Sequence, residues 1–145
     1  MKYIKSFVET SSWKDEIENT CKDILLPLSD NRIEIECLRP SPFFEIGSSK
    51  SEQTEFDIAV VVGDIDITRG YPASGPVFLV KDYEDEFLRL IDYMQSKEFY
   101  LIRFDFDDNG EISWFRDFGT GIESLPKHLI DLRETVYLKL YFDRR

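Results

Sequence analysis

The sequence predicts one α+β domain over residues 1–145, with a mostly antiparallel sheet, a prominent C-terminal β-hairpin and about three helices. Residues 99–118 hold two runs rich in aromatic and β-branched residues around a polar turn, which is the pattern of a hairpin. Residues 13–28 and 83–95 carry apolar residues at helical spacing. No repeat or linker divides the chain. Its length suffices to bury a core without a disulfide or a structural metal.

The first helix is predicted over residues 13–28, where six apolar residues form one stripe: Trp13, Ile17, Cys21, Ile24, Leu25 and Leu28. Pro27 lies in the last turn and should end or distort the helix. A strand follows over residues 32–38, because Ile33, Ile35 and Cys37 alternate there with two glutamates.

The middle of the chain predicts a buried strand and a second helix. Residues 43–46 suggest a short strand, and residues 56–62 form a continuous apolar run typical of a central strand covered on both faces. Another short strand is predicted over residues 77–80. Asp82 is then expected to cap a helix over residues 83–95, whose buried stripe is Tyr83, Phe87, Leu90, Ile91 and Met94.

A third helix is predicted from about Leu125, with Pro126 at an early position that tolerates proline. Its apolar stripe is formed by Leu129, Leu132, Val136 and Leu140.

The register of the hairpin depends on its loop. A three-residue loop, Asp108 to Gly110 with Gly110 in the left-handed conformation, pairs Phe106 with Ile112 and Phe104 with Trp114. A two-residue Asn109-Gly110 loop pairs Phe106 with Ser113 instead. Since a slip of one residue inverts the faces, we expect the three-residue register, which gathers the apolar side chains on one face.

The charge balance favours a basic partner. With 18 Lys and Arg against 29 Asp and Glu, the net charge is −11, which repels nucleic acid and anionic lipid. Residues 82–117 hold 11 acids against four bases and therefore carry −7 of it. No apolar run approaches the ~20 residues of a membrane span, so a cytoplasmic protein is expected. Cys21 and Cys37 are expected to be reduced and buried, with a disulfide between them as the alternative.

Two patterns resemble functional motifs without completing them. Residues 105–112 are locally similar to a calcium-binding EF-hand loop, but Arg116 stands where that loop needs its bidentate glutamate. Gly47-Ser48 followed by Asp57 resembles the nucleotidyltransferase pattern, but Ala59 replaces the second metal-binding carboxylate. His128 is expected at the surface. The sequence therefore predicts no metal, no cofactor and no catalytic residue, with a degenerate nucleotidyltransferase or another small enzyme domain as the alternative.

Acidic residues beside aromatic ones on the hairpin suit a protein partner that is itself basic. In size and acidic α+β character the whole chain is similar to bacterial immunity proteins of contact-dependent inhibition and other polymorphic toxin systems. That resemblance implies an inhibitor that covers a cognate toxin, often a nuclease, and binds neither nucleic acid nor membrane. The expected contact residues are Asp105, Asp107, Asp108, Glu111, Phe115 and Asp117.

Overall fold

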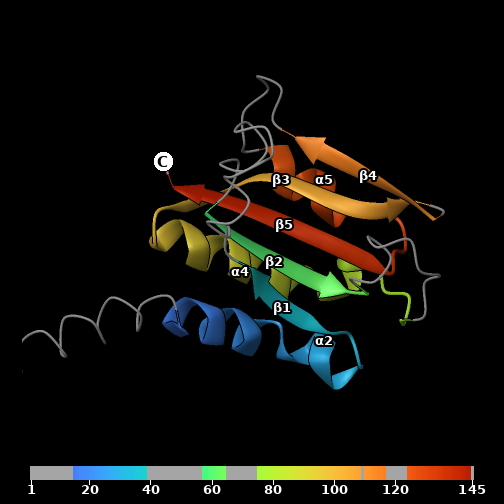
Figure 1. The fold of residues 1–145 in the computed structure, drawn as a ribbon, viewed down its shortest axis with the longest axis horizontal. Coiled ribbons are helices and arrows are strands. Elements are labelled where there is room, and N and C mark those ends of the chain that lie inside the picture. Colours follow the sequence, from blue (N-terminus) through green and yellow to red (C-terminus); the bar gives the residue numbers. More distant parts are fainter. Residues whose placement is uncertain (1–14, 39–56, 65–74, 109, 117–123, 145) are drawn as a thin grey trace, which may run out of the picture.

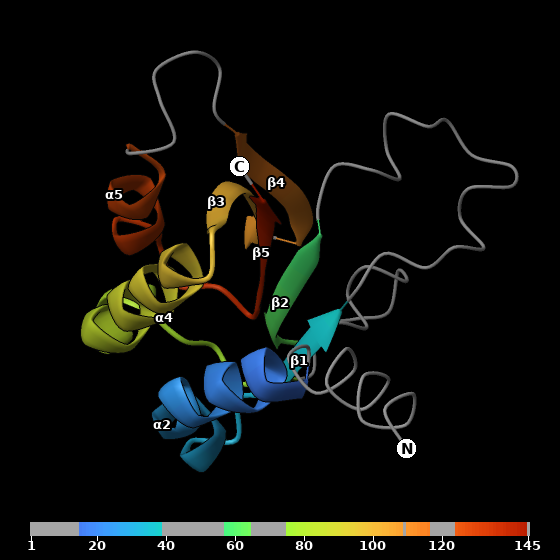
Figure 2. The same ribbon diagram turned by 90° about the vertical axis from the view of Figure 1, so that its left-hand side faces the viewer.

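The computed structural model describes five stretches of the chain: residues 15–38, 57–64, 75–108, 110–116 and 124–144. Within them lies one five-stranded antiparallel sheet, and the described helices pack on one of its faces (Figures 1 and 2). The predicted α+β class with a mostly antiparallel sheet is confirmed. Residues 43–46, Trp13 and Asp117 lie outside the described residues.

The sheet has the order β1-β2-β5-β3-β4. Its strands are β1 (Ile35–Leu38), β2 (Ile58–Gly63), β3 (Phe99–Asp108), β4 (Glu111–Arg116) and β5 (Tyr137–Arg144). The last strand of the chain lies in the middle, where it joins the β1–β2 pair to the β3–β4 hairpin. The hairpin therefore forms one end of the sheet, and β4 is its edge strand (Figure 1).

The helices cover one face, called the helix side below; the opposite face is the far face. Residues 15–24 are helical, and α2 (Leu26–Asp30) follows after a break at Leu25. Pro27 was predicted in the last turn of a single helix, but it stands in the first turn of α2. The 3-10 helix η3 (Val80–Tyr83) leads into α4 (Glu84–Ser96), and α5 (Leu125–Ile130) precedes β5.

The core lies between the sheet and these helices. Four of the five residues predicted for the stripe of α4 are buried there: Phe87, Leu90, Ile91 and Met94. The fifth, Tyr83, is half-buried and belongs to η3. All six residues of β2 are buried, as expected for a strand covered on both faces. The largest fully buried aromatic side chains are Phe87, Phe99, Phe104 and Phe142.

The prediction of a long third helix was wrong. Helix α5 ends at Ile130, and Tyr137–Arg144 is the central strand β5. Leu138, Leu140 and Phe142 belong to the core, and their spacing of two residues is that of a strand. The helix was predicted because residues 132, 136 and 140 also have the spacing of a helical stripe. The aromatic and branched content of this segment, together with burial on both faces, favours the strand.

Two smaller predictions before α4 were also wrong. Asp82 does not cap the helix, because its first turn follows directly from η3 and Tyr83 stands at the N-cap without a side-chain hydrogen bond. Residues 77–80 are not a strand: Phe78 forms an isolated antiparallel bridge with Thr135. Asp82 has the residue type of an N-cap, but it lies inside the 3-10 helix that precedes α4.

The hairpin has the register of the two-residue loop, so the expected three-residue loop was wrong. Asp108 pairs with Glu111 and Phe104 pairs with Phe115. Gly110 does have a positive φ of 90°, and its N–H donates to Asp107 Oδ1 at 2.9 Å. An Asn-Gly pair favours a two-residue hairpin loop. A register shift between Leu101 and Arg103 then lets both Leu101 and Phe104 face the core.

Gly110→Val should lower the free energy of unfolding by about 1 kcal/mol, because a β-branched residue is strained at positive φ. A Cβ at this position meets no atom within 4 Å, so the cost is conformational. Gly110→Asn is the matched control and should lose less, since Asn tolerates this conformation. Urea unfolding curves measure both variants, and equal stability of wild type and Gly110→Val would contradict the turn.

Candidate functional site

Strand β4 presents apolar side chains at the edge of the sheet. Five of its six residues are exposed. Of the six exposed large hydrophobic side chains among the described residues, three lie on β4: Ile112, Trp114 and Phe115. Their exposed fractions are 40%, 47% and 37%. This concentration on one short edge strand makes the hairpin the strongest candidate for a binding surface.

On the helix side, Phe115 belongs to an aromatic stack that joins the hairpin to α5. Its ring stacks on Phe104 at 5.3 Å and on His128 at 4.9 Å between centroids. Phe106 lies 6.0 Å from the same ring. These three rings hold Phe115 in place while its side chain keeps an exposed portion, as a rigid anchor for a partner requires.

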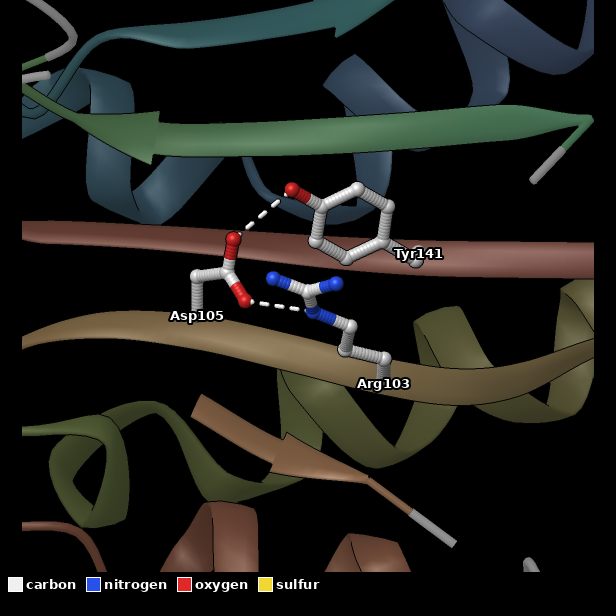
Figure 3. Close-up of polar contacts among 3 residues, drawn as sticks. All are labelled: Arg103, Asp105 and Tyr141. Atoms are coloured by element: carbon white, nitrogen blue, oxygen red, sulfur yellow. Dashed lines mark hydrogen bonds and ion pairs between the residues drawn. The ribbon is translucent and has the colours of Figure 1, made fainter. Parts of the chain in front are cut away.

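On the far face, a polar cluster links β3 to β5 (Figure 3). The Arg103 Nε–H donates to Asp105 Oδ1 at 2.8 Å, and the Tyr141 hydroxyl donates to Asp105 Oδ2 at 2.7 Å. The Arg103 guanidinium lies over the Tyr141 ring at 5.0 Å and over the Trp114 ring at 5.6 Å. Asp105 is only 6% exposed, so both of its oxygens are satisfied inside the protein.

Burial sets the protonation of the groups around Asp105. It raises the pKa of Tyr141, and the hydrogen bond to Asp105 raises that pKa further, so the phenol stays a hydrogen-bond donor. Burial lowers the pKa of Lys139, whose ammonium lies 4.8 Å from the Tyr141 ring. The hydrogen bonds of the cluster order the hairpin against β5.

Stability should fall above pH 10 in a way that depends on Tyr141. Its pKa in the folded protein lies above the ordinary value of 10.0, so the protonated phenol stabilises the fold below pH 10 and this contribution is lost as the pH rises further. Tyr141→Phe lacks this group and should lose less stability between about pH 9 and about pH 11. Urea unfolding at the two pH values measures the difference, and parallel losses would contradict the burial of the phenol.

The structure separates the predicted contact residues. Asp105 is buried and Asp107 half-buried, and both are directed to the far face, whereas Phe115 lies on the helix side. Asp108 and Glu111 are exposed and share the side of Phe115 by strand register. The exposed hairpin surface is defined below as Asp108, Glu111, Ile112, Trp114 and Phe115.

Sequence reasoning missed Ile112, Trp114 and His128. The first two were assigned to the core by the wrong register, although the Asn109-Gly110 pair already favoured the shorter loop. His128 is exposed as expected, but its stack on Phe115 carries no sequence signal, because α5 and β4 meet only in the fold.

The residues of the two incomplete motifs have other roles. Asp57 is exposed, and its Oδ2 accepts the backbone N–H of Arg144 at 2.9 Å, while Ala59 is fully buried. Gly47 and Ser48 lie outside the described residues. Over the described stretches, no group of three or more His, Cys, Asp or Glu side chains is placed to hold a metal ion.

No disulfide joins Cys21 and Cys37, so the alternative of a disulfide between them was wrong. Cys21 is buried and Cys37 half-buried, and a hydrogen bond with Cys37 raises the pKa of the Cys21 thiol, with burial as the next cause.

A small pocket of about 280 Å³, lined by Glu34, Ile35, Glu36, Val61 and Gly63, lies at the β1 edge, away from the hairpin.

Comparison with known proteins gives no assignment. No family model matches the chain, and no curated protein or solved structure is significantly similar to it. Among the described helices, none combines the length and the apolar character that crossing a membrane requires. The case for a function therefore rests on the hairpin surface.

Proposed function

We propose that this chain is a cytoplasmic binding protein of the immunity or antitoxin class, which neutralises a basic protein toxin by covering it. Its net charge of −11 gives a field that attracts a basic partner and accelerates the encounter. A toxin that acts on nucleic acid is itself basic, because it must bind the negatively charged phosphates. An acidic inhibitor carries the same sign of charge as the nucleic acid and therefore attracts the toxin in the same way.

The observation that carries this proposal is the exposed apolar surface of the edge strand β4 beside acidic residues. Trp114 and Phe115 are half exposed, and Asp108 and Glu111 stand at the adjoining tip of the hairpin. Interface cores are enriched in aromatic residues, and a polar rim around them sets orientation and the rate of association. Because Trp114 and Phe115 lie on opposite faces of the sheet, this arrangement fits a basic protein surface that contacts the edge strand from both faces.

The test is co-expression with the product of the gene immediately upstream. Cells that make this product alone should stop growing, and wild-type chain should restore their growth. The double variant Trp114→Ala and Glu111→Lys should fail to restore it while keeping the circular dichroism spectrum of the wild type. The control Asp23→Lys changes an exposed acid on the first helix, remote from β4, and should protect as well as wild type. A harmless upstream product, or a toxic one that wild type does not relieve, rejects the function.

A further inference from the structure

The main chain of β4 is oriented by a contact on the other side of β3. The Asp107 N–H donates to Thr135 Oγ1 at 3.1 Å, and the same hydroxyl lies 3.1 Å from the Asp107 carbonyl and 2.8 Å from the Tyr137 carbonyl, the two acceptors for its one proton. Both main-chain groups of Asp107 therefore point away from β4. Asp107 and Ile112 are cross-strand partners, so they form a non-hydrogen-bonded pair of the antiparallel ladder. The N–H and C=O of Ile112 consequently point to the outer edge of the sheet.

Strand β4 carries charges only at its two ends, Glu111 and Arg116, and leaves its middle unprotected by proline, lysine or any other charged residue. Its exposed side chains include two aromatic residues and an isoleucine. The opposite edge strand, β1, has four residues, of which three are half-buried. An exposed edge strand of six residues with an apolar middle is a template for the addition of another strand.

We propose that β4 binds an extended segment of the basic partner as a sixth strand of the sheet. The inference rests on the proposed function, since it states how the partner engages the same hairpin surface. A second copy of the chain fits this edge poorly, because each copy carries a net charge of −11 and an acidic hairpin tip. A basic segment has the complementary charge.

The side chains of β4 define the sequence of the incoming strand. Glu111 and Phe115 project to the helix side, whereas Ile112, Trp114 and Arg116 project to the far face. Residues that pair directly share a face. The partner strand should therefore place a lysine or arginine opposite Glu111 and apolar residues opposite Ile112, Trp114 and Phe115.

The experiment separates main-chain from side-chain recognition. Ile112→Pro removes the outward N–H, and proline is tolerated on an edge strand when its nitrogen faces outward. Ile112→Val keeps the N–H and is the matched control. Ser113→Pro removes an N–H that points toward β3 and should broaden or lower the thermal melt, whereas Ile112→Pro should melt within a few degrees of Ile112→Val.

Surface plasmon resonance against an inactivated form of the upstream gene product then gives the affinities. Ile112→Pro should bind about 10-fold or more weakly than Ile112→Val, because an acceptor on the partner loses its donor. Hydrogen exchange of the Ile112 amide, followed by NMR, should slow in the complex of the wild-type chain.

Each other outcome overturns the proposal in a distinct way. If wild type does not bind the upstream product, both the function and the strand addition fail. If wild type binds while Ile112→Pro matches Ile112→Val and the Ile112 amide exchanges as in the free protein, the function stands and strand addition is wrong. A dimer of the free wild type that Ile112→Pro disperses would make a second copy the occupant and would also reject it.

Discussion

Gly63→Ala should lower the free energy of unfolding by about 3 kcal/mol, because the residue sits at a φ of +98° and has no room for a side chain. A Cβ would collide with the backbone carbonyl oxygen of Val136. That carbonyl is fixed, since it accepts the Asp64 N–H at 2.8 Å, and Gly63 itself donates to the Glu34 carbonyl at 2.8 Å. Three segments therefore meet at a position where only glycine fits.

Gly110→Ala is the matched control for this prediction. Gly110 has a similar positive φ, but a Cβ there meets nothing within 4 Å, so alanine should cost only about 1 kcal/mol. Urea unfolding of the two variants isolates the cost of the collision. Equal losses at the two positions would mean that the Val136 carbonyl does not approach Gly63 closely.

Asp105→Ala should lower the free energy of unfolding by about 3 kcal/mol, because it leaves the Arg103 guanidinium and the Tyr141 hydroxyl without their shared acceptor. The Arg103 side chain is 26% exposed, so water offsets part of the loss. Tyr141→Phe removes one donor only and should cost about 1 kcal/mol.

A double-mutant cycle makes this prediction specific. The double variant Asp105→Ala, Tyr141→Phe should lose less free energy of unfolding than the sum of the two single losses, because the hydroxyl that Asp105→Ala leaves without its acceptor is absent. Guanidinium unfolding measures all four proteins. Additive losses would show that the Tyr141 hydroxyl does not bond to Asp105 in solution.

The elements that sequence predicted well are those whose pattern is local. The stripe of α4 and the buried run of β2 are complete within one stretch of chain, so periodicity identifies them. Strand β5 was not predicted, because Leu132, Val136 and Leu140 fit a helical stripe. Only its place between β2 and β3 makes Tyr137–Arg144 a strand. Tertiary context overrides such an ambiguous local pattern.

The sequence predicted the hairpin that carries the candidate site, but not which of its side chains are exposed together. The hairpin and its acidic tip were evident from residues 99–118, yet the sides of Trp114 and Phe115 depend on the register. The burial of Asp105 depends on Tyr141, which lies 36 residues further along the chain. A contact across that distance leaves no trace in the local pattern, so sequence alone placed Asp105 in the interface.

On the proposed function, a basic partner binds at the exposed hairpin surface. Binding kinetics are the most direct test of this contact. Surface plasmon resonance against the inactivated upstream gene product, at low and at physiological salt, compares wild type with Glu111→Lys, Trp114→Ala and the Asp23→Lys control. We expect association of the wild type to slow steeply with salt, Glu111→Lys to associate about 10-fold more slowly, and Trp114→Ala to dissociate about 30-fold faster. Asp23→Lys should behave as wild type. Wild-type kinetics for both hairpin variants, with their folds intact, would contradict the assignment of the interface to β4.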